Sequence, residues 1–92
     1  MINITHNPSS KRFETTIDSI TAYLSYADDG NDVLDYQHTI VPSQLGGQGI
    51  GKALTKYALD HARQHNKKVI PTCGFVASYI NKNPHYQDLV FG

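Results

Sequence analysis

The sequence predicts an α+β fold built on a mixed β-sheet, and three observations lead to this prediction. From Lys11 to Val41 apolar residues alternate with polar ones, which is the two-residue period of strands that bury one face. From about Gly49 to His65 apolar residues follow the period of an amphipathic helix. Lys68–Cys73 then favours a short strand. Because strand–helix–strand connections are right-handed crossovers, the strands before and after the helix are expected to lie parallel and close together.

The first half of the chain is expected to form an antiparallel meander. Turn-forming residues at 7–10 and at 28–31 separate its strands. An additional edge strand is expected around Ile2 and Ile4, and the third strand of the meander is expected at Val33–Val41. The residues predicted to share a face within each strand are Phe13, Thr15 and Ile17, then Ile20, Ala22, Leu24 and Tyr26, and then Leu34, Tyr36, His38 and Ile40.

The second half of the chain is expected to contain two helices. The buried face of the first is predicted from Ile50, Leu54, Tyr57, Ala58 and His61. The following strand contains Pro71, which lacks a donor for the ladder. A shorter helix is predicted at Phe75–Lys82, since the Asn83-Pro84 pair disfavours its continuation. A last strand is predicted at Tyr86–Phe91.

Length and charge restrict the classes of protein to which the chain can belong. Its 92 residues suffice for one domain, expected to span 1–92. Eight Lys and Arg balance eight Asp and Glu, so the basic excess typical of nucleic-acid binding is missing, as is a polybasic segment for a membrane surface. Apolar runs are too short for a membrane helix, and no signal-peptide pattern is evident. With a single cysteine, a cytoplasmic protein is expected.

A glycine-rich loop lies between the predicted third strand and the first helix. Glycine permits left-handed backbone and close approach of a ligand, and the helix behind it presents unpaired N–H groups. Strand, glycine loop and helix N-terminus together favour an anion site for phosphate or pyrophosphate, whereas the simpler alternative is a flexible turn. The residues of this loop are Gly46, Gly47, Gln48, Gly49, Ile50, Gly51 and Lys52.

Two phosphate-binding patterns fit the loop incompletely. The dinucleotide pattern G-x-G-x-x-G, begun at Gly47, would need a third glycine where Lys52 stands. The nucleoside-triphosphate pattern G-x-x-x-x-G-K matches Gly46, Gly51 and Lys52, but Ala53 replaces the Ser or Thr that holds magnesium. No later strand ends in a suitable acidic residue. A nucleotide-binding loop of the second kind remains an alternative.

The stretch Val41–Leu54 resembles the acetyl-CoA loop of the GNAT superfamily of N-acetyltransferases, whose pattern is Q/R-x-x-G-x-G/A. Its glycines correspond to Gly49 and Gly51, and Gly46 replaces the Gln or Arg. The resemblance is greatest to very small members of the superfamily and extends from about His38 to Asp88. It includes His38-Thr39-Ile40-Val41 before the loop, Cys73 after the next strand, Tyr79 on the short helix, and Asn83-Pro84-His85-Tyr86-Gln87-Asp88-Leu89.

The resemblance implies a minimal GNAT-like acyltransferase fold and an N-acetyltransferase that takes its acetyl group from acetyl-CoA. It places Thr39, Ile40 and Val41 along the pantetheine arm, and Phe75 and Asn83 near the adenosine or pantetheine channel. Residues Gly46, Gly47, Gln48, Gly49, Ile50, Gly51 and Lys52 would surround the pyrophosphate. The acceptor would be an unidentified amine on a small molecule, a peptide or a protein.

Three residues are candidates for catalysis. The resemblance suggests that Cys73 takes the acetyl group and passes it on, since a cysteine beside a histidine can be a thiolate nucleophile. Alternatively, Cys73 is a small buried hydrophobe. His38 is either a base or an ordinary sheet histidine. Tyr79 lies where the superfamily often has a tyrosine that protonates the departing CoA thiolate, although a core tyrosine is also consistent with its position.

The remaining titratable residues do not predict a metal site. His61 and His65 are four residues apart on the helix, a spacing that can hold a metal, but the sequence shows no third ligand near them. The open alternatives to an enzyme are a module that binds CoA or acyl-CoA without turnover and, as a third class, a nucleotide-binding protein. A monomer or weak dimer is expected.

Overall fold

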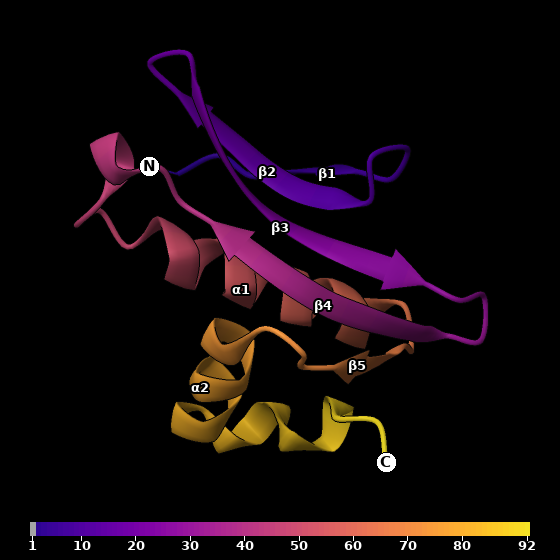
Figure 1. The fold of residues 1–92 in the computed structure, drawn as a ribbon. Coiled ribbons are helices and arrows are strands. Elements are labelled where there is room, and N and C mark those ends of the chain that lie inside the picture. Colours follow the sequence, from indigo (N-terminus) through magenta and orange to yellow (C-terminus); the bar gives the residue numbers. More distant parts are fainter. Residues whose placement is uncertain (1) are drawn as a thin grey trace.

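A computed structural model, which describes residues 2–92, shows a five-stranded mixed sheet in the order β1-β2-β3-β4-β5 (Figure 1). The strands are β1 (Thr5–Asn7), β2 (Arg12–Ile17), β3 (Ile20–Asp28), β4 (Val33–Ile40) and β5 (Lys68–Ile70). The first four are antiparallel neighbours, whereas β5 pairs parallel with β4. This parallel pairing confirms the predicted strand–helix–strand arrangement.

The helices complete a single hydrophobic core with the sheet. They are the 3-10 helix η1 (Ser43–Leu45), α1 (Ile50–Gln64), α2 (Gly74–Lys82) and the 3-10 helix η2 (Pro84–Leu89). Helix α1 packs against strands β2 to β5, while α2 and η2 contact α1 and each other at the β5 end of the sheet (Figure 1). Within residues 2–92, the helices are all too short or too polar to cross a membrane.

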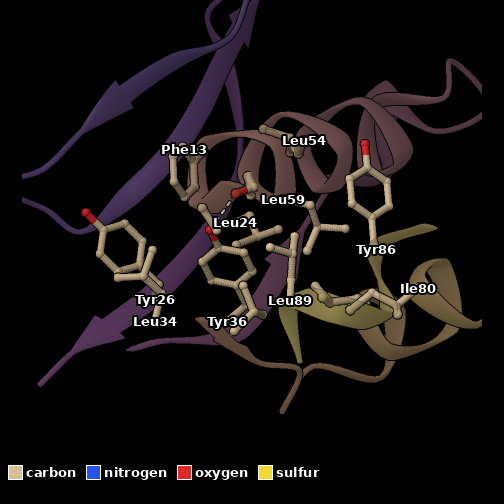
Figure 2. Packing of buried hydrophobic residues seen from close by; sticks show 14 of the residues in the cluster. Phe13, Leu24, Tyr26, Leu34, Tyr36, Leu54, Leu59, Ile80, Tyr86 and Leu89 are labelled. Carbon is tan, nitrogen blue, oxygen red and sulfur yellow. Dashed lines mark hydrogen bonds between the residues drawn. The ribbon is translucent and has the colours of Figure 1, made fainter. Parts of the chain in front are cut away.

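The core fills the space between the inner face of the sheet and α1. Strand residues Phe13, Leu24 and Tyr36 are fully buried there, facing Leu54 and Leu59 of α1 (Figure 2). The Tyr36 hydroxyl donates a 2.5 Å hydrogen bond to the carbonyl of Ala58, which ties β4 to α1. The C-terminal elements add their own buried side chains to the same cluster, namely Val76, Ile80, Tyr86 and Leu89.

The inward faces of β2 and β3 and the bounds of α1 confirm the sequence prediction. Phe13, Ala22 and Leu24 are buried as the alternation requires. Helix α1 begins after its N-cap, Gly49, and ends at its C-cap, His65. Its buried stripe is wider than predicted toward Thr55, Leu59 and Ala62, and Tyr57 is instead 40% exposed.

The C-terminal segment corrects the prediction of a last strand at Tyr86–Phe91. Residues 86–89 belong to η2. Of the two residues that follow, Val90 forms an isolated bridge with Val69 of β5. The buried residues Tyr86 and Leu89 are three apart, which is the repeat of a 3-10 helix, and Pro84 is favourable in its first turn.

Two other strands also differ from their predicted bounds. The strand predicted at Lys68–Cys73 ends at Ile70, immediately before Pro71. The edge strand predicted around Ile2 and Ile4 lies at Thr5–Asn7 instead. In both cases the predicted element exists but is shorter or displaced along the chain.

A β-bulge in β4 reverses the predicted orientation of its second half. Tyr26 pairs with Tyr36 and Ser25 pairs with His38, so Gln37 has no partner residue on β3. Directly paired residues share a face, and Thr39 pairs with the buried Leu24. Thr39 therefore lies on the helix-covered face, while His38 and Ile40 lie on the opposite face and are exposed. The prediction that His38 and Ile40 share a face with Tyr36 is wrong.

Contacts between aromatic rings connect the edge strand β1 to α1. The His6 ring stacks on Phe13 at 4.6 Å between centroids, and it meets the His61 ring edge-on at 4.6 Å. The His61 ring stacks in turn on His65 at 4.2 Å. His6 Nε2 lies 2.7 Å from the Tyr26 hydroxyl. Three histidines are thus grouped around one side of the core.

Candidate functional site

The end of β4 has an open edge on the side away from β3. Strand β5 pairs only with Val33, Leu34 and Asp35, so the part of β4 from Tyr36 to Ile40 has no strand neighbour there among residues 2–92. A backbone hydrogen bond crosses the gap, from the Cys73 N–H to the Tyr36 carbonyl at 2.9 Å. An extended ligand can add to such an edge as though it were another strand.

Cys73 stands at this opening, where the chain turns from β5 into α2. Its backbone is the N-cap of α2, and its side chain is partly buried. The Cys73 sulfur lies 3.5 Å from the Thr39 hydroxyl, which the bulge in β4 has turned toward the helices. The bulge therefore decides which side chain of β4 meets the sulfur, and that side chain is Thr39 rather than His38.

The surroundings of Cys73 favour its thiolate form. Partial burial raises the pKa of the Cys73 thiol, but hydrogen bonds from the Thr39 hydroxyl and from the backbone N–H groups of Val76, Phe75 and Thr39 outweigh it. The net pKa of Cys73 lies below its ordinary value. N–H groups at a helix N-terminus commonly have this effect on a cysteine.

The glycine loop leads from the open edge of β4 into α1. After η1, Gly47 and Gly49 both have positive φ angles, of 79° and 72°, which L side chains adopt only with strain. Gly46 is extended, with a φ of −63°. Residues Gly46, Gly47, Gln48 and Gly49 are all exposed. The predicted loop therefore exposes its backbone immediately before α1.

The first N–H groups of α1 have no hydrogen-bond partner in the part of the chain that the structure describes. The N-cap of the helix, Gly49, supplies no side-chain hydrogen bond, and the first turn contains no acidic residue. The first N–H groups of the helix, at Ile50, Gly51 and Lys52, form the positive end of its dipole, and no side chain within residues 2–92 caps them. This arrangement fits a pyrophosphate, because anions bind to such N–H groups.

Helix α2 packs against this N-terminus through a glycine–aromatic contact. A Cβ atom added to Gly51 would lie 3.0 Å from Cζ of Phe75. The Phe75 ring, which is 44% exposed, therefore covers the first turn of α1 at the position where a side chain would otherwise stand. The lack of a side chain at Gly51 brings α2 close to the loop.

A groove runs between α1 and α2 from this contact. Its larger cavity measures about 530 Å³ and is lined by Lys52, Ala53, Lys56, Tyr79, Lys82 and Asn83. An adjoining cavity of about 90 Å³ adds Phe75 and Ser78. Asn83 Nδ2 donates a 2.9 Å hydrogen bond to the Tyr79 carbonyl. The structure thus brings together Lys52, Phe75, Tyr79 and Asn83, all of them predicted site residues.

A profile of the family described as GCN5-related N-acetyl-transferase matches residues 12–89 of this chain. The chain belongs to the GCN5-related N-acetyltransferase family. Protein NATD1 of Mus musculus is 33% identical over 85 residues, which cover 90% of this chain and 77% of that protein. Protein NATD1 of Danio rerio is 30% identical over 90 residues, which cover 96% of this chain and 82% of the fish protein.

The fold also agrees with that of a solved GCN5-like protein. The NMR solution structure of a GCN5-like protein from Staphylococcus aureus matches with a TM-score of 0.75 at 34% sequence identity, covering 98% of this chain and 88% of that one. The α+β fold with its mixed sheet is therefore GNAT-like, as the resemblance implied.

Sequence reasoning missed several features of this candidate site. The hydroxyl of Thr39 contacts Cys73, although only its backbone was expected to matter. Lys56 and Lys82 line the groove but were not singled out. The spacing of Lys52 and Lys56, four residues apart, would have placed two lysines on one side of α1. Nothing local in the sequence indicates the bulge that selects Thr39.

Proposed function

We propose that this protein is an N-acetyltransferase that binds acetyl-CoA along the open edge of β4 and transfers the acetyl group to an amine. The observation that carries the proposal is the continuity of three features. The unpaired edge of β4 leads at one end to the glycine loop and the uncapped N-terminus of α1, and Cys73 lies beside it. A long ligand with a pyrophosphate can occupy these places together.

The residues proposed to hold acetyl-CoA divide by the kind of contact. The backbone of Thr39, Ile40 and Val41 would pair with the amides of the pantetheine arm. The loop from Gly46 to Lys52 would bind the pyrophosphate through backbone N–H groups, which the absence of a side chain at Gly46 does not remove. Phe75 and Asn83 would border the nucleoside part. Acetyl-CoA supplies an acetyl thioester, which is activated toward nucleophiles.

Cys73 is the proposed nucleophile of a two-step route. As a thiolate, its sulfur would attack the acetyl carbon, so that a new carbon–sulfur bond forms while the bond to the CoA sulfur breaks and that sulfur leaves with the electron pair. Tyr79 lines the groove between α1 and α2 with Lys52 and Lys82, so this route does not use it, and solvent is the proposed source of the proton for the leaving sulfur. A neutral amine would then attack the acetyl-cysteine, lose its proton, and release Cys73 as a thiolate again.

The proposed route does not use His38. Its ring lies on the face of the sheet opposite Thr39, while Cys73 contacts the Thr39 hydroxyl. Direct attack of the amine on acetyl-CoA, without an acetyl-cysteine, is the competing route. Both routes share the cofactor site and differ only in whether Cys73 becomes acetylated.

Titration of isotopically labelled protein with acetyl-CoA tests the cofactor site. Saturable shifts of the backbone amides are expected at 39–52 and around Cys73, without any need for magnesium. Shifts that appear only with a magnesium nucleotide would instead favour the nucleotide-binding alternative. A shift pattern that avoids the β4 edge and the loop would refute the proposed site.

Mass spectrometry of the intact protein tests the role of Cys73. Incubation with acetyl-CoA in the absence of an amine should add one acetyl group to the wild type and none to Cys73→Ala. Cys73→Ala should still bind CoA, because the sulfur is not among the proposed pyrophosphate contacts. If the variant transfers acetyl to amines as fast as the wild type, transfer is direct. If CoA binds and no amine is ever acetylated, the protein is a binding module.

A further inference from the structure

The groove between α1 and α2 concentrates positive charge in a chain whose formal net charge is zero. Lys52 and Lys56 from α1 and Lys82 from α2 line its main cavity, and no Asp or Glu lines it. These three residues are a large share of the eight Lys and Arg in the sequence. A second cavity is lined by Arg63, Lys67 and Lys68, but Asp88 lines it as well and forms an ion pair with Arg63.

Two of the three ammonium groups have no counter-ion in the part of the chain that the structure describes. Lys56 Nζ forms an ion pair with Asp60 at 2.8 Å. Lys52 and Lys82 form no ion pair within residues 2–92. An anion in the groove would thus meet two uncompensated positive charges and a third that is shared with Asp60.

The other walls of the groove suit a nucleoside. Phe75 and Tyr79 contribute aromatic rings, and an aromatic ring face can stack on a base. Because Asn83 Nδ2 already donates to the Tyr79 carbonyl, its side-chain oxygen is left to accept a hydrogen bond. Aromatic rings, an amide and lysines together match a phosphorylated nucleoside better than an isolated phosphate.

The groove starts where the proposed pyrophosphate site ends. Lys52 belongs to the first turn of α1, and Lys56 lies four residues further, about 6 Å along the axis. Phe75 touches both regions, since its ring covers Gly51 and lines the smaller cavity. A ligand whose pyrophosphate lies at the N-terminus of α1 would place its attached nucleoside at this groove.

We propose that Lys52, Lys56 and Lys82 hold the 3′-phosphate of CoA and make the protein select CoA over 3′-dephospho-CoA. This inference rests on the proposed function, because it assumes that CoA occupies the β4 edge and the glycine loop. The 3′-phosphate is the only group by which the two ligands differ, so their affinity ratio measures its recognition alone.

Calorimetric titrations with CoA and with 3′-dephospho-CoA, at one fixed salt concentration, test the inference. The wild type should bind CoA about tenfold more tightly, as expected for a few partly screened charge pairs. Lys82→Gln should reduce this ratio to about threefold, mainly by weakening CoA. Lys11→Gln removes the same charge from the exposed turn between β1 and β2, and should leave the ratio unchanged.

The outcomes separate this inference from the proposed function. If both ligands bind equally and shift the amides of the glycine loop, the 3′-phosphate assignment is wrong while the CoA site stands. If Lys82→Gln weakens both ligands to the same extent, Lys82 acts only as a distant charge and the assignment is also wrong. If neither ligand shifts the loop, the proposed function and this inference both fail.

Discussion

Mild acid should destabilise this protein through the histidines that join β1 to α1. Burial, followed by the charges of His6, His65 and Lys67, lowers the pKa of His61 from 6.5 to about 4. Burial and His65 also lower the pKa of His6. Because the pKa of His61 is lower in the folded protein than in the unfolded chain, the unfolded chain takes up the proton at a higher pH. The contribution of His61 to stability is therefore complete above pH 6.5 and is lost as the pH falls toward 4.

The magnitude follows from the His61 pKa. A shift from 6.5 to about 4 corresponds to a loss of about 2 kcal/mol between about pH 7.5 and about pH 5. His61 is only partly buried, so solvent screening should reduce this to about 1 kcal/mol. In a domain of this size, that loss lowers Tm by roughly 4–8 °C. Asp60 and Asp88 have pKa values below their ordinary 3.8, so they titrate at lower pH than this window.

Thermal melts of the wild type and of His61→Gln at the two pH values test this reasoning. His61→Gln should lose most of the pH-dependent fall in Tm, even if its Tm at neutral pH is lower through lost packing. The control His85→Gln changes an exposed histidine outside the cluster and should keep the full fall. An equal fall in the wild type and in His61→Gln would show that His61 does not carry the effect.

Three further predictions concern the site and its supports. Thr39→Val should raise the pKa of Cys73 and slow its alkylation by iodoacetamide about threefold at neutral pH, because a hydrogen bond to the thiolate is lost. Gly49→Ala should cost about 1 kcal/mol of unfolding free energy in urea, since its φ is 72°, and Gly49→Asn should cost less. Tyr36→Phe should cost about 1–2 kcal/mol in the same assay, because a buried hydrogen bond to α1 is removed.

Each of these predictions has a result that contradicts it. The control Thr21→Val makes the same change on the exposed side of the sheet. If Cys73 is alkylated at the same rate in Thr21→Val and in Thr39→Val, the Thr39 hydroxyl has no influence on Cys73. Gly49→Ala as stable as the wild type would show that the loop does not need left-handed backbone. Tyr36→Phe should cost more than Tyr23→Phe, whose ring is only partly buried, and equal costs would refute the role of the bond.

Local patterns predicted the glycine loop and α1 well. Gly49 could be placed at the start of the helix because glycine content and the helical period change at the same point of the chain. The parallel pairing of β5 followed from a general rule of chain connection. These inferences depend on neighbours in sequence or on topology, and neither requires knowledge of side-chain packing.

The features that the sequence did not reveal depend on contacts between distant segments. The orientation of His38 was wrong because one unpaired residue, Gln37, reverses the alternation, and a bulge leaves no local mark in such a pattern. The C-terminal segment was predicted as a strand, whereas the three-residue spacing of its buried residues Tyr86 and Leu89 fits the 3-10 helix that the structure shows. The groove lysines come from two helices, so only the packing of α2 on α1 unites them.

The bulge in β4 has a consequence for how this protein can vary in evolution. The side chain that meets Cys73 is set by the number of residues in the strand, and not only by their identities. Loss of Gln37 alone would make the strand regular and leave the orientations unchanged, because His38 would then follow Tyr36 directly and Thr39 would still face the helices. Homologues that are one residue shorter here should therefore present the same side chain to the cysteine from a regular strand, whereas a regular strand of unchanged length would present the residue before it.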